Sequence, residues 1–589
     1  MLLVLLLKLN SMSDEDLKQI SSFTKIKYLN RILKPKEKIA IYSAIILLIL
    51  ILIGGSIRYY LSSTTTAPAN GGEYTEGVPV DSAGIPTNIN PLLSSTRPID
   101  ETIASLIYSS LFKYDSNGQL KSDLVNSYEN KESKEYTLHL KSNILWHDGK
   151  PLTAQDVIFT VNLLQDPYYN PINAKEWDKE KITISSPDDH TVIFKLSDAY
   201  APFLSKLTFG ILPKHLWIGI SKENFALTEL NLKPVGSGPF IFDELKQNTD
   251  NEIVSYKLIA NKNYYNQKPY LERLIFNFYR DKDAVIDAYN HKEITGFNLS
   301  EYSKATEFKD RKDTDIHTIA IPQYFSILLN QGESIPLADE RVRQALRLGT
   351  NRDEFIEQIF HNYAEKIYSP LIKPFIAEDF HYDENLIKYD PEEAKKLLEK
   401  AGWKKTDKSD YRQKDNAELK IKLVVAKTAD LAKTAEIIKN QWKNIGVNIE
   451  IIQSDNQLDI RQKYLNPRKF ESLISGVQYS GNDPNLFFFW HSSGKKAPGL
   501  NFTLYDNEKV DKLLEESKKA KTIKEKNEKY IEVSKQLLQD SPAIFLYSPK
   551  YLYITNKKIK GVNTQAIVKA SNHLKNINTW YIKTKRIKK

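Results

Sequence analysis

The sequence contains no cysteine in its 589 residues. Without a thiol, the chain forms no disulfide, no thiolate metal site, no cysteine nucleophile and no lipid anchor on an N-terminal cysteine. Its ten histidines are scattered, and its net charge of +9 is spread over interleaved lysine and glutamate rather than gathered into a basic stripe. We therefore expect no metal, no cofactor and no nucleic-acid partner.

Long apolar runs are also scarce, and one of them, residues 39–57 (IAIYSAIILLILILIGGSI), suffices for a bilayer crossing. Residues 1–38 carry eight Lys and Arg against four acids, so the positive-inside rule predicts a cytoplasmic N-terminal segment. The large domain would then lie on the extracytoplasmic side of the cell membrane, after a polar linker over residues 58–73. Two alternatives stay open: a buried core helix, and a signal peptide cut near Ala67–Ala69.

Beyond this run, strand-like and helix-like patterns are mixed, which predicts an α/β fold. Period-two alternation predicts strands within residues 135–143, 191–197, 255–265 and 273–280. Helices are predicted within residues 338–360, with a break near Thr350, within 390–403, and within 431–452, where Gly446 separates a helix from a strand. In the 390–403 helix, Asp390 is the expected cap, Glu393 completes a capping box and Gly402 ends the helix.

The stretch LWHDGKPLTAQDVIFT, residues 145–160, places His147 beside Asp148 and so raises the question of catalysis. A catalytic pair needs a nucleophile and an orienting third group, whereas adjacent residues in an Asp-Gly turn point apart. Thr153 with Asp156 instead predicts a capped helix start. An S-x-x-K match at Ser492 lacks its companion motifs in the right order. We therefore expect a protein that is not an enzyme.

Several motifs occur together in a fixed order: LHLKSNILWHDGKPLTAQDVIFTVN, PVGSGPF, DERVRQALRLGTNRDEFI, DPEEAKKLLEKAGW, QWKNIGVNIEI and SPAIFLYSP. From about Gly71 to its end, the chain resembles the family 5 extracellular solute-binding proteins. These are the peptide-, dipeptide- and nickel-binding receptors of ABC importers. The resemblance implies a two-lobed, periplasmic-binding-protein-like fold of the large, three-subdomain type, with a ligand held between the lobes.

The same resemblance implies a division of residues 74–589, the solute-binding domain. Lobe I would comprise residues 74–110, 232–315 and 541–589, lobe II residues 316–540, and a subdomain far from the ligand residues 111–231.

In peptide-binding relatives, backbone edges beside the cleft hold the ligand's main chain. The matching edges here would be Gly476–Gln478 in lobe II and Pro98–Asp100 in lobe I. Ser480 falls where dipeptide- and oligopeptide-binding relatives carry an Asp that holds the ligand's ammonium, so either Asp483 replaces it or the ligand has no free amine there. The candidate ligand-binding residues are Ile99, Asp100, Tyr324, Asn330, Gly476, Val477, Gln478, Tyr479, Ser480, Asp483 and Trp490.

Together, the resemblance and the apolar run over residues 39–57 predict a membrane-anchored binding protein that passes peptides to ABC permease subunits. A peptide-sensing receptor without a transport role is the first alternative, and a hydrolase on a similar scaffold is the less favoured one. A sugar or a metal chelate as ligand also stays open.

Overall fold

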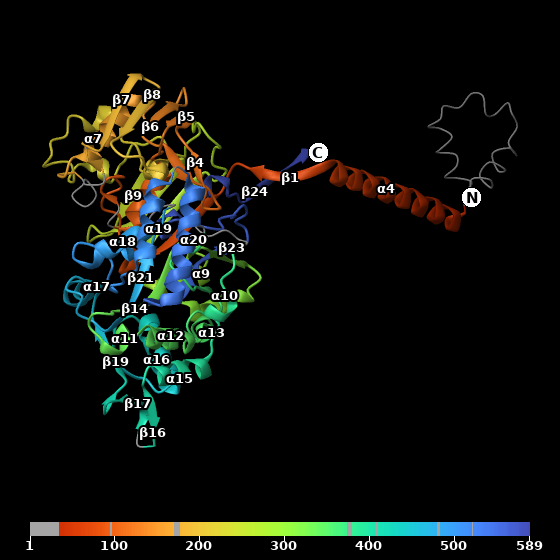
Figure 1. The fold of residues 1–589 in the computed structure, drawn as a ribbon. Helices are drawn as coiled ribbons and strands as arrows, with labels where there is room; N and C mark the ends of the chain where they lie inside the picture. The colour runs from red at the N-terminus through yellow and green to blue at the C-terminus, as the bar shows by residue number, and fades with distance from the viewer. Residues whose placement is uncertain are drawn as a thin grey trace, which may run out of the picture. The chain divides into compact units, whose positions relative to one another are not determined.

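The computed structural model describes residues 34–94, 97–169, 177–178, 180–373, 380–407, 409–479, 483–520 and 522–589. The chain divides into two compact units, a small one of Met1–Ala69 with Thr584–Lys589, and a large one of Asn70–Lys583 (Figure 1).

The small unit is built on helix α4, Pro35–Ser63. Its Lys38–Ser63 part is long and apolar enough to cross a membrane and buries none of its side chains in the protein. Strand β1, Thr64–Ala69, follows at once and pairs with the C-terminal strand β24, Lys583–Lys588. The segment expected as a linker therefore contains the end of a helix and a paired strand.

A seven-stranded sheet forms the first lobe, in the order β13-β23-β12-β2-β11-β10-β9. Strand β2 runs parallel to β11 and β12, and the other neighbours are antiparallel. Its strands are β2 Glu73–Pro79, β9 Phe240–Gln247, β10 Ile253–Ala260, β11 Arg273–Tyr279, β12 Gly296–Leu299, β13 Thr314–Ile319 and β23 Tyr551–Asn556; its helices are α5 Val80–Ala83, α6 Pro98–Ile107, α9 Lys282–Asn290 and α10 Ala305–Lys309.

A six-stranded sheet, β15-β22-β14-β21-β19-β20, forms the second lobe. Its strands are β14 Gln323–Leu329, β15 Ala364–Lys366, β19 Lys420–Ala426, β20 Asn448–Ser454, β21 Ser472–Gln478 and β22 Ala543–Pro549. We expected residues 541–549 in lobe I, but β22 pairs with β14 and β15, so the chain returns to the first lobe only after Pro549.

The second lobe also holds most of the helices and a small sheet, β16-β17-β18. These elements are α11 Ile335–Ala338, α12 Glu340–Leu348, α13 Arg352–Gln358, α14 Glu384–Ile387, α15 Pro391–Lys400, α16 Ala429–Asn444, α17 Gln457–Ile460, α18 Leu486–Trp490, α19 Glu508–Lys519, α20 Ile523–Asp540, β16 Lys404–Thr406, β17 Ser409–Lys414 and β18 Ala417–Glu418.

The subdomain is a four-stranded antiparallel sheet, β5-β6-β8-β7, with helix α7 packed against it (Figure 1). Its elements are β3 Phe112–Tyr114, β4 Leu120–Ser122, β5 Val125–Lys131, β6 Glu135–Leu140, α7 Ala154–Gln165, β7 Ile182–Asp188, β8 Thr191–Leu196 and α8 Lys214–Trp217.

The elements predicted from periodicity are confirmed, with one difference in capping. Strands occur in all four predicted segments, and helices α12 and α13 are separated at the expected break. Gly402 and Gly446 have positive φ, +91° and +87°, as residues that end helices often do. Asp390 accepts a hydrogen bond from Glu393 N at 2.9 Å, but the Glu393 carboxylate pairs with Lys396 at 3.2 Å instead of completing the capping box.

Candidate ligand-binding cleft

A cavity of about 1020 Å³ is lined by the subdomain, by the first lobe and by the second lobe. Residues 164–210 of the subdomain supply one wall, residues 91–110 and 568–578 of the first lobe another, and residues 483–526 of the second lobe a third. We expected the subdomain to be far from the ligand. If the ligand occupies this cavity, residues 164–210 of the subdomain lie beside it rather than far from it.

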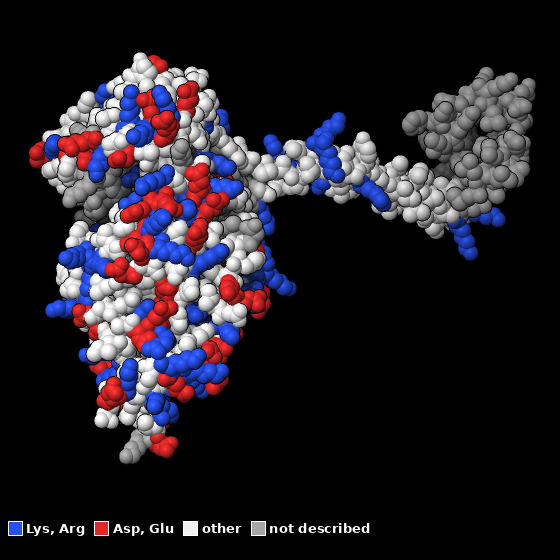
Figure 2. All heavy atoms as spheres, viewed as in Figure 1, with Lys and Arg blue, Asp and Glu red and all other residues white. Residues whose placement is uncertain are grey.

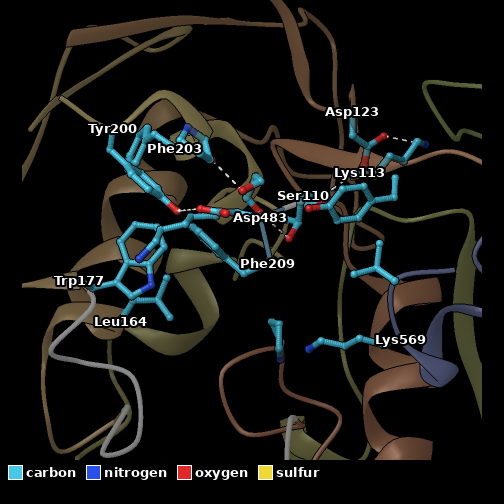
Figure 3. Close-up of a pocket in the computed structure, with 18 of the residues that line it drawn as sticks. Ser110, Lys113, Asp123, Leu164, Trp177, Tyr200, Phe203, Phe209, Asp483 and Lys569 are labelled. Atoms are coloured by element: carbon cyan, nitrogen blue, oxygen red, sulfur yellow. Dashed lines mark hydrogen bonds and ion pairs between the residues drawn. The ribbon is translucent and has the colours of Figure 1, made fainter. Parts of the chain in front are cut away.

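One end of the cavity is apolar. Leu164 from α7, Trp177, Phe203 and Phe209 gather there on the subdomain side (Figure 3). The Trp177 and Phe209 rings meet edge to face, with centroids 5.3 Å apart. Such a surface accommodates an apolar group of a ligand.

The other end of the cavity is charged. Lys113 pairs with Asp123 at 2.9 Å (Figure 3). Lys569 pairs with Glu101 at 2.6 Å. Burial opposes the charge on Lys113, but the adjacent Asp123 outweighs it and holds the pKa of that lysine above its usual value. Lys575 lines the same cavity and forms no such ion pair with the residues that the structure describes.

Asp483 links the second lobe to the subdomain. Its carboxylate accepts hydrogen bonds from Lys526 at 2.6 Å, from Tyr530 at 3.2 Å and, across the cavity, from the Tyr200 hydroxyl at 3.4 Å. Burial and the neighbouring Asp483 charge raise the pKa of Tyr530 far above its usual range. The structure therefore gives the Asp483 carboxylate a lysine partner of its own. The carboxylate also accepts a hydrogen bond from Asn485 N at 2.9 Å, as a turn residue does.

Strand β21 provides a partly open backbone edge at Gly476–Gln478. Tyr479 N donates to Pro322 O at 2.9 Å, which continues the antiparallel register that pairs Val477 with Tyr324. Because ladder hydrogen bonds use alternate residues, the N–H and C=O groups of Gly476 and Gln478 point away from β14. On that side, β19 pairs with β21 only at residues 472 and 473, so it leaves the edge at Gly476–Gln478 uncovered.

A side chain at position 476 would clash with the neighbouring strand β14. A Cβ there would lie 2.7 Å from Cε1 of Phe325, the residue opposite on β14, which explains glycine at this point of the edge.

We expected Pro98–Asp100 to form an extended backbone edge, and this expectation is wrong. These residues begin helix α6, with Pro98 in the first turn, where proline is well tolerated. Ile99 is buried, and the buried Asp100 carboxylate accepts hydrogen bonds from Thr87 N at 2.8 Å, Thr87 Oγ1 at 3.0 Å and Asn88 N at 3.1 Å. Through these hydrogen bonds, the Asp100 carboxylate holds the preceding loop at Thr87 and Asn88 in place.

Four other candidates lie in the interior of the second lobe, and among the described candidates Asp483 alone lines the cavity. Tyr324 packs against Tyr479, whose hydroxyl donates to Pro370 O at 2.7 Å. Trp490 packs against Phe545, with ring centroids 5.9 Å apart. Asn330 is buried and donates to Arg468 O at 2.8 Å. Ser480 lies outside the described residues.

His147 and Asp148 have separate partners. Gly236 N donates to His147 Nδ1 at 3.2 Å, and Nε2 lies 3.1 Å from Gly238 O, so the ring is neutral and bonds backbone on both sides. Burial lowers the pKa of His147 to about 4. Asp148 pairs with His215 at 2.7 Å. The pair forms part of the scaffold, as the sequence predicts.

Thr153 caps helix α7 in the predicted capping box. Its hydroxyl accepts from Gln155 N at 3.3 Å, and Thr153 N donates to the Asp156 carboxylate at 2.8 Å. The box fixes the start of the helix whose later residue Leu164 lines the apolar end of the cavity.

Sequence reasoning did not find Tyr200, Lys526 or Lys575. Lys526 meets Asp483 across 43 residues of sequence, and Tyr200 meets it across 283, so no local pattern indicates either contact. Among the described residues, no group of three or more His, Asp and Glu gathers as a metal site.

Comparison with known proteins gives consistent matches. A sequence model of bacterial extracellular solute-binding proteins, family 5 Middle, matches residues 119–499. The chain is 28% identical to the oligopeptide-binding protein AppA of Bacillus subtilis (strain 168) over 529 residues, covering 87% of this chain and 92% of AppA. The structure of B. subtilis AppA in complex with a nonapeptide matches with a TM-score of 0.64 and 26% identity, covering 88% of this chain and 100% of AppA.

A second solved structure is similar to the same extent. NikZ from Campylobacter jejuni, in complex with Ni(L-His), matches with a TM-score of 0.66 and 25% identity, covering 86% of this chain and 99% of NikZ.

Proposed function

Because the chain belongs to the bacterial extracellular solute-binding proteins of family 5, we propose that it is a membrane-anchored protein that captures peptides between its lobes. It would deliver them to the permease of an ABC importer on the extracytoplasmic side of the membrane. The related proteins are binding proteins rather than enzymes, in agreement with the scaffold role of His147 and Asp148.

The observation that supports a peptide ligand is the uncovered edge of β21. Gly476 and Gln478 are exposed and direct their backbone groups away from β14. An extended peptide can add to such an edge through main-chain hydrogen bonds, which hold it with little regard to its side chains. The nonapeptide in the similar AppA structure agrees with a ligand of this kind.

The cavity, whose lining does not include Gly476–Gln478, offers an apolar end and a charged end as separate surfaces for side-chain contacts. A cavity of about 1020 Å³ matches the upper range of small-ligand sites, which fits a short peptide.

Helix α4 supports the anchor. Its apolar side chains are exposed over Lys38–Ser63, and an exposed apolar surface of that length is stable in a bilayer. Figure 2 shows it largely free of charge between blue residues near both ends. External protease on intact cells should digest the large unit, whereas full protection would contradict this orientation. A mature chain that begins after Ala69 would instead identify a cleaved signal peptide.

Native mass spectrometry of the detergent-purified full chain tests the ligand. We expect peptide masses that leave on denaturation, and stoichiometric rebinding of added peptides measured by calorimetry. Rebinding of a nickel–histidine complex with no binding of any peptide would overturn the proposal. Uptake of labelled peptide that persists after deletion of the gene would argue for the sensing receptor.

A further inference from the structure

The lining of the cavity carries more positive than negative charge. Among its described residues are seven lysines and four carboxylates. The lysines are Lys113, Lys181, Lys206, Lys518, Lys526, Lys569 and Lys575; the acids are Glu101, Asp123, Asp198 and Asp483. In a cleft with low-dielectric walls, such an excess attracts anions.

Three of the four acids on the cavity wall already form ion pairs with neighbouring lysines. Asp123 holds Lys113 at 2.9 Å, Glu101 holds Lys569 at 2.6 Å and Asp483 holds Lys526 at 2.6 Å. The remaining acid, Asp198, is exposed and accepts from the Ser197 hydroxyl at 3.0 Å. The excess positive charge therefore belongs to lysines outside these three pairs.

Those remaining lysines differ in their surroundings. Lys181 is exposed to solvent. Lys206 and Lys518 lie over the rings of Tyr200 and Phe487, respectively. Lys575 is half-buried, and its ammonium has neither a hydrogen bond nor an ion pair with any residue that the structure describes.

The charged residues around Lys575 do not compensate for the lack of a hydrogen-bond or ion-pair partner among the described residues. Asp123 and Glu101 attract its ammonium but are each bonded to another lysine, while Lys113 and Lys569 repel it. Burial is the largest influence, and together these effects lower the pKa of Lys575 to about 8. A half-buried, unpaired ammonium costs free energy that a carboxylate partner would recover.

We propose that Lys575 binds a carboxylate of the ligand, so that the cleft selects peptides that place an acidic group at this end of the cavity. This inference rests on the proposed peptide-binding function. The carboxylate is either an Asp or Glu side chain or the C-terminus of the peptide, because both present the same two oxygens to the ammonium. The apolar cluster at the other end of the cavity would then receive a neighbouring apolar side chain.

Calorimetry on the full chain in detergent tests the proposal with matched pentapeptides. One set carries a single Glu among alanines at each position in turn, a second carries Gln instead, and both sets are repeated as C-terminal amides. We expect one of the two changes, Glu to Gln or acid to amide, to weaken binding at least tenfold, which is about 1.4 kcal/mol. Which change does so identifies the source of the carboxylate.

Variants assign the effect to one residue. Lys575→Met should abolish the preference and leave the affinity for the weaker peptide unchanged within about twofold, while Lys575→Arg should retain the preference. Lys558→Met, which removes an exposed lysine that does not line the cavity, is the matched control and should change nothing. Thermal unfolding of each variant verifies that it folds.

The outcomes separate the inference from the proposed function. If the wild-type protein binds the peptides but ignores both changes, or if Lys575→Met keeps the preference, the role of Lys575 is wrong and peptide binding stands. If no peptide binds the wild-type protein at all, the proposed function fails and the inference fails with it.

Discussion

Asp483 and Lys575 line the same cavity from different lobes, yet their surroundings are opposite. The Asp483 carboxylate is almost fully buried and bonded to Lys526, Tyr530 and Tyr200. The Lys575 ammonium has no partner among the described residues. A charged group that the fold already satisfies contributes to stability, whereas one that it leaves unsatisfied is available to a ligand. Exchanging or removing each group tests this distinction.

The largest effect is expected at Asp483. Asp483→Ala leaves the Lys526 ammonium unpaired with only 10% of its side chain exposed, and breaking a buried pair typically costs about 3–5 kcal/mol. Chemical denaturation should show this loss, and Asp483→Asn combined with Lys526→Met should recover much of it. A loss below about 1 kcal/mol in the alanine variant would show that the pair does not support the fold.

At Lys575 we expect a change in affinity rather than in folding. In the protein without ligand, the pKa of Lys575 is about 8, so its side chain is mostly charged below pH 8 and mostly neutral above it. The affinity for an N-acetylated peptide with the preferred carboxylate should therefore fall roughly tenfold from pH 7 to pH 10. In Lys575→Arg, which stays charged, calorimetry should find no such fall; an equal fall in both proteins would assign it to another group.

The lowered pKa of Lys575 also predicts how its contribution to the free energy of unfolding changes with pH. Its pKa is lowered in the folded state, so its unfavourable contribution is complete below about pH 8 and is relieved as the pH rises towards the unfolded value near 10.5. Lys575→Met should consequently be no less stable than wild type at pH 7, in contrast to Asp483→Ala. The difference in unfolding free energy between wild type and Lys575→Met measures this directly, and a stability loss at pH 7 would break the comparison.

The stretch LWHDGKPLTAQDVIFT, residues 145–160, contributes a smaller, purely structural effect. Thr153→Ala removes the cap of α7 and should lower stability by about 0.5–2 kcal/mol. His147→Ala should leave ligand affinity nearly unchanged, because its ring bonds only the backbone at Gly236 and Gly238. Binding assays on the folded variants suffice; a tenfold loss of affinity in His147→Ala would place that residue in the ligand site.

The smallest effect is expected at the ligand's amine. Ser480 is neutral, and Asp483 already has Lys526 as its partner, so the described residues of this loop offer no unpaired carboxylate to an ammonium. Peptides with free and acetylated N-termini should bind with less than a tenfold difference in calorimetry. A preference of tenfold or more for the free amine, abolished by Asp483→Asn, would show that Asp483 leaves Lys526 for the ligand.

Sequence reasoning performed best where the signal is local. The cap at Thr153 and the helix stop at Gly446 both follow from residues within one element, whereas the edge at Gly476 was placed by the resemblance. The resemblance of ordered motifs supplied the family and hence the architecture. The misplacement of β22 shows the limit, since strand pairing and not the chain's own pattern decides which lobe receives it.

The site was less predictable, for a physical reason. Whether a charged residue is free depends on partners from distant segments, as with Lys526 and Tyr200 at Asp483. Pro98–Asp100 illustrates the same point, because Thr87 and Asn88 satisfy the Asp100 carboxylate and the backbone enters a helix. Lys575 carries no motif at all, and only the packing around it distinguishes it from the other lysines.

Hydrogen exchange of the full chain, with and without a bound peptide, tests the central claim that a peptide's main chain adds to the free edge of β21. We predict slowed exchange at the amides of Gly476 and Gln478, which point away from β14, and little change at Val477, which already donates to Tyr324. Saturating peptide with unchanged exchange at Gly476 and Gln478 would contradict the account.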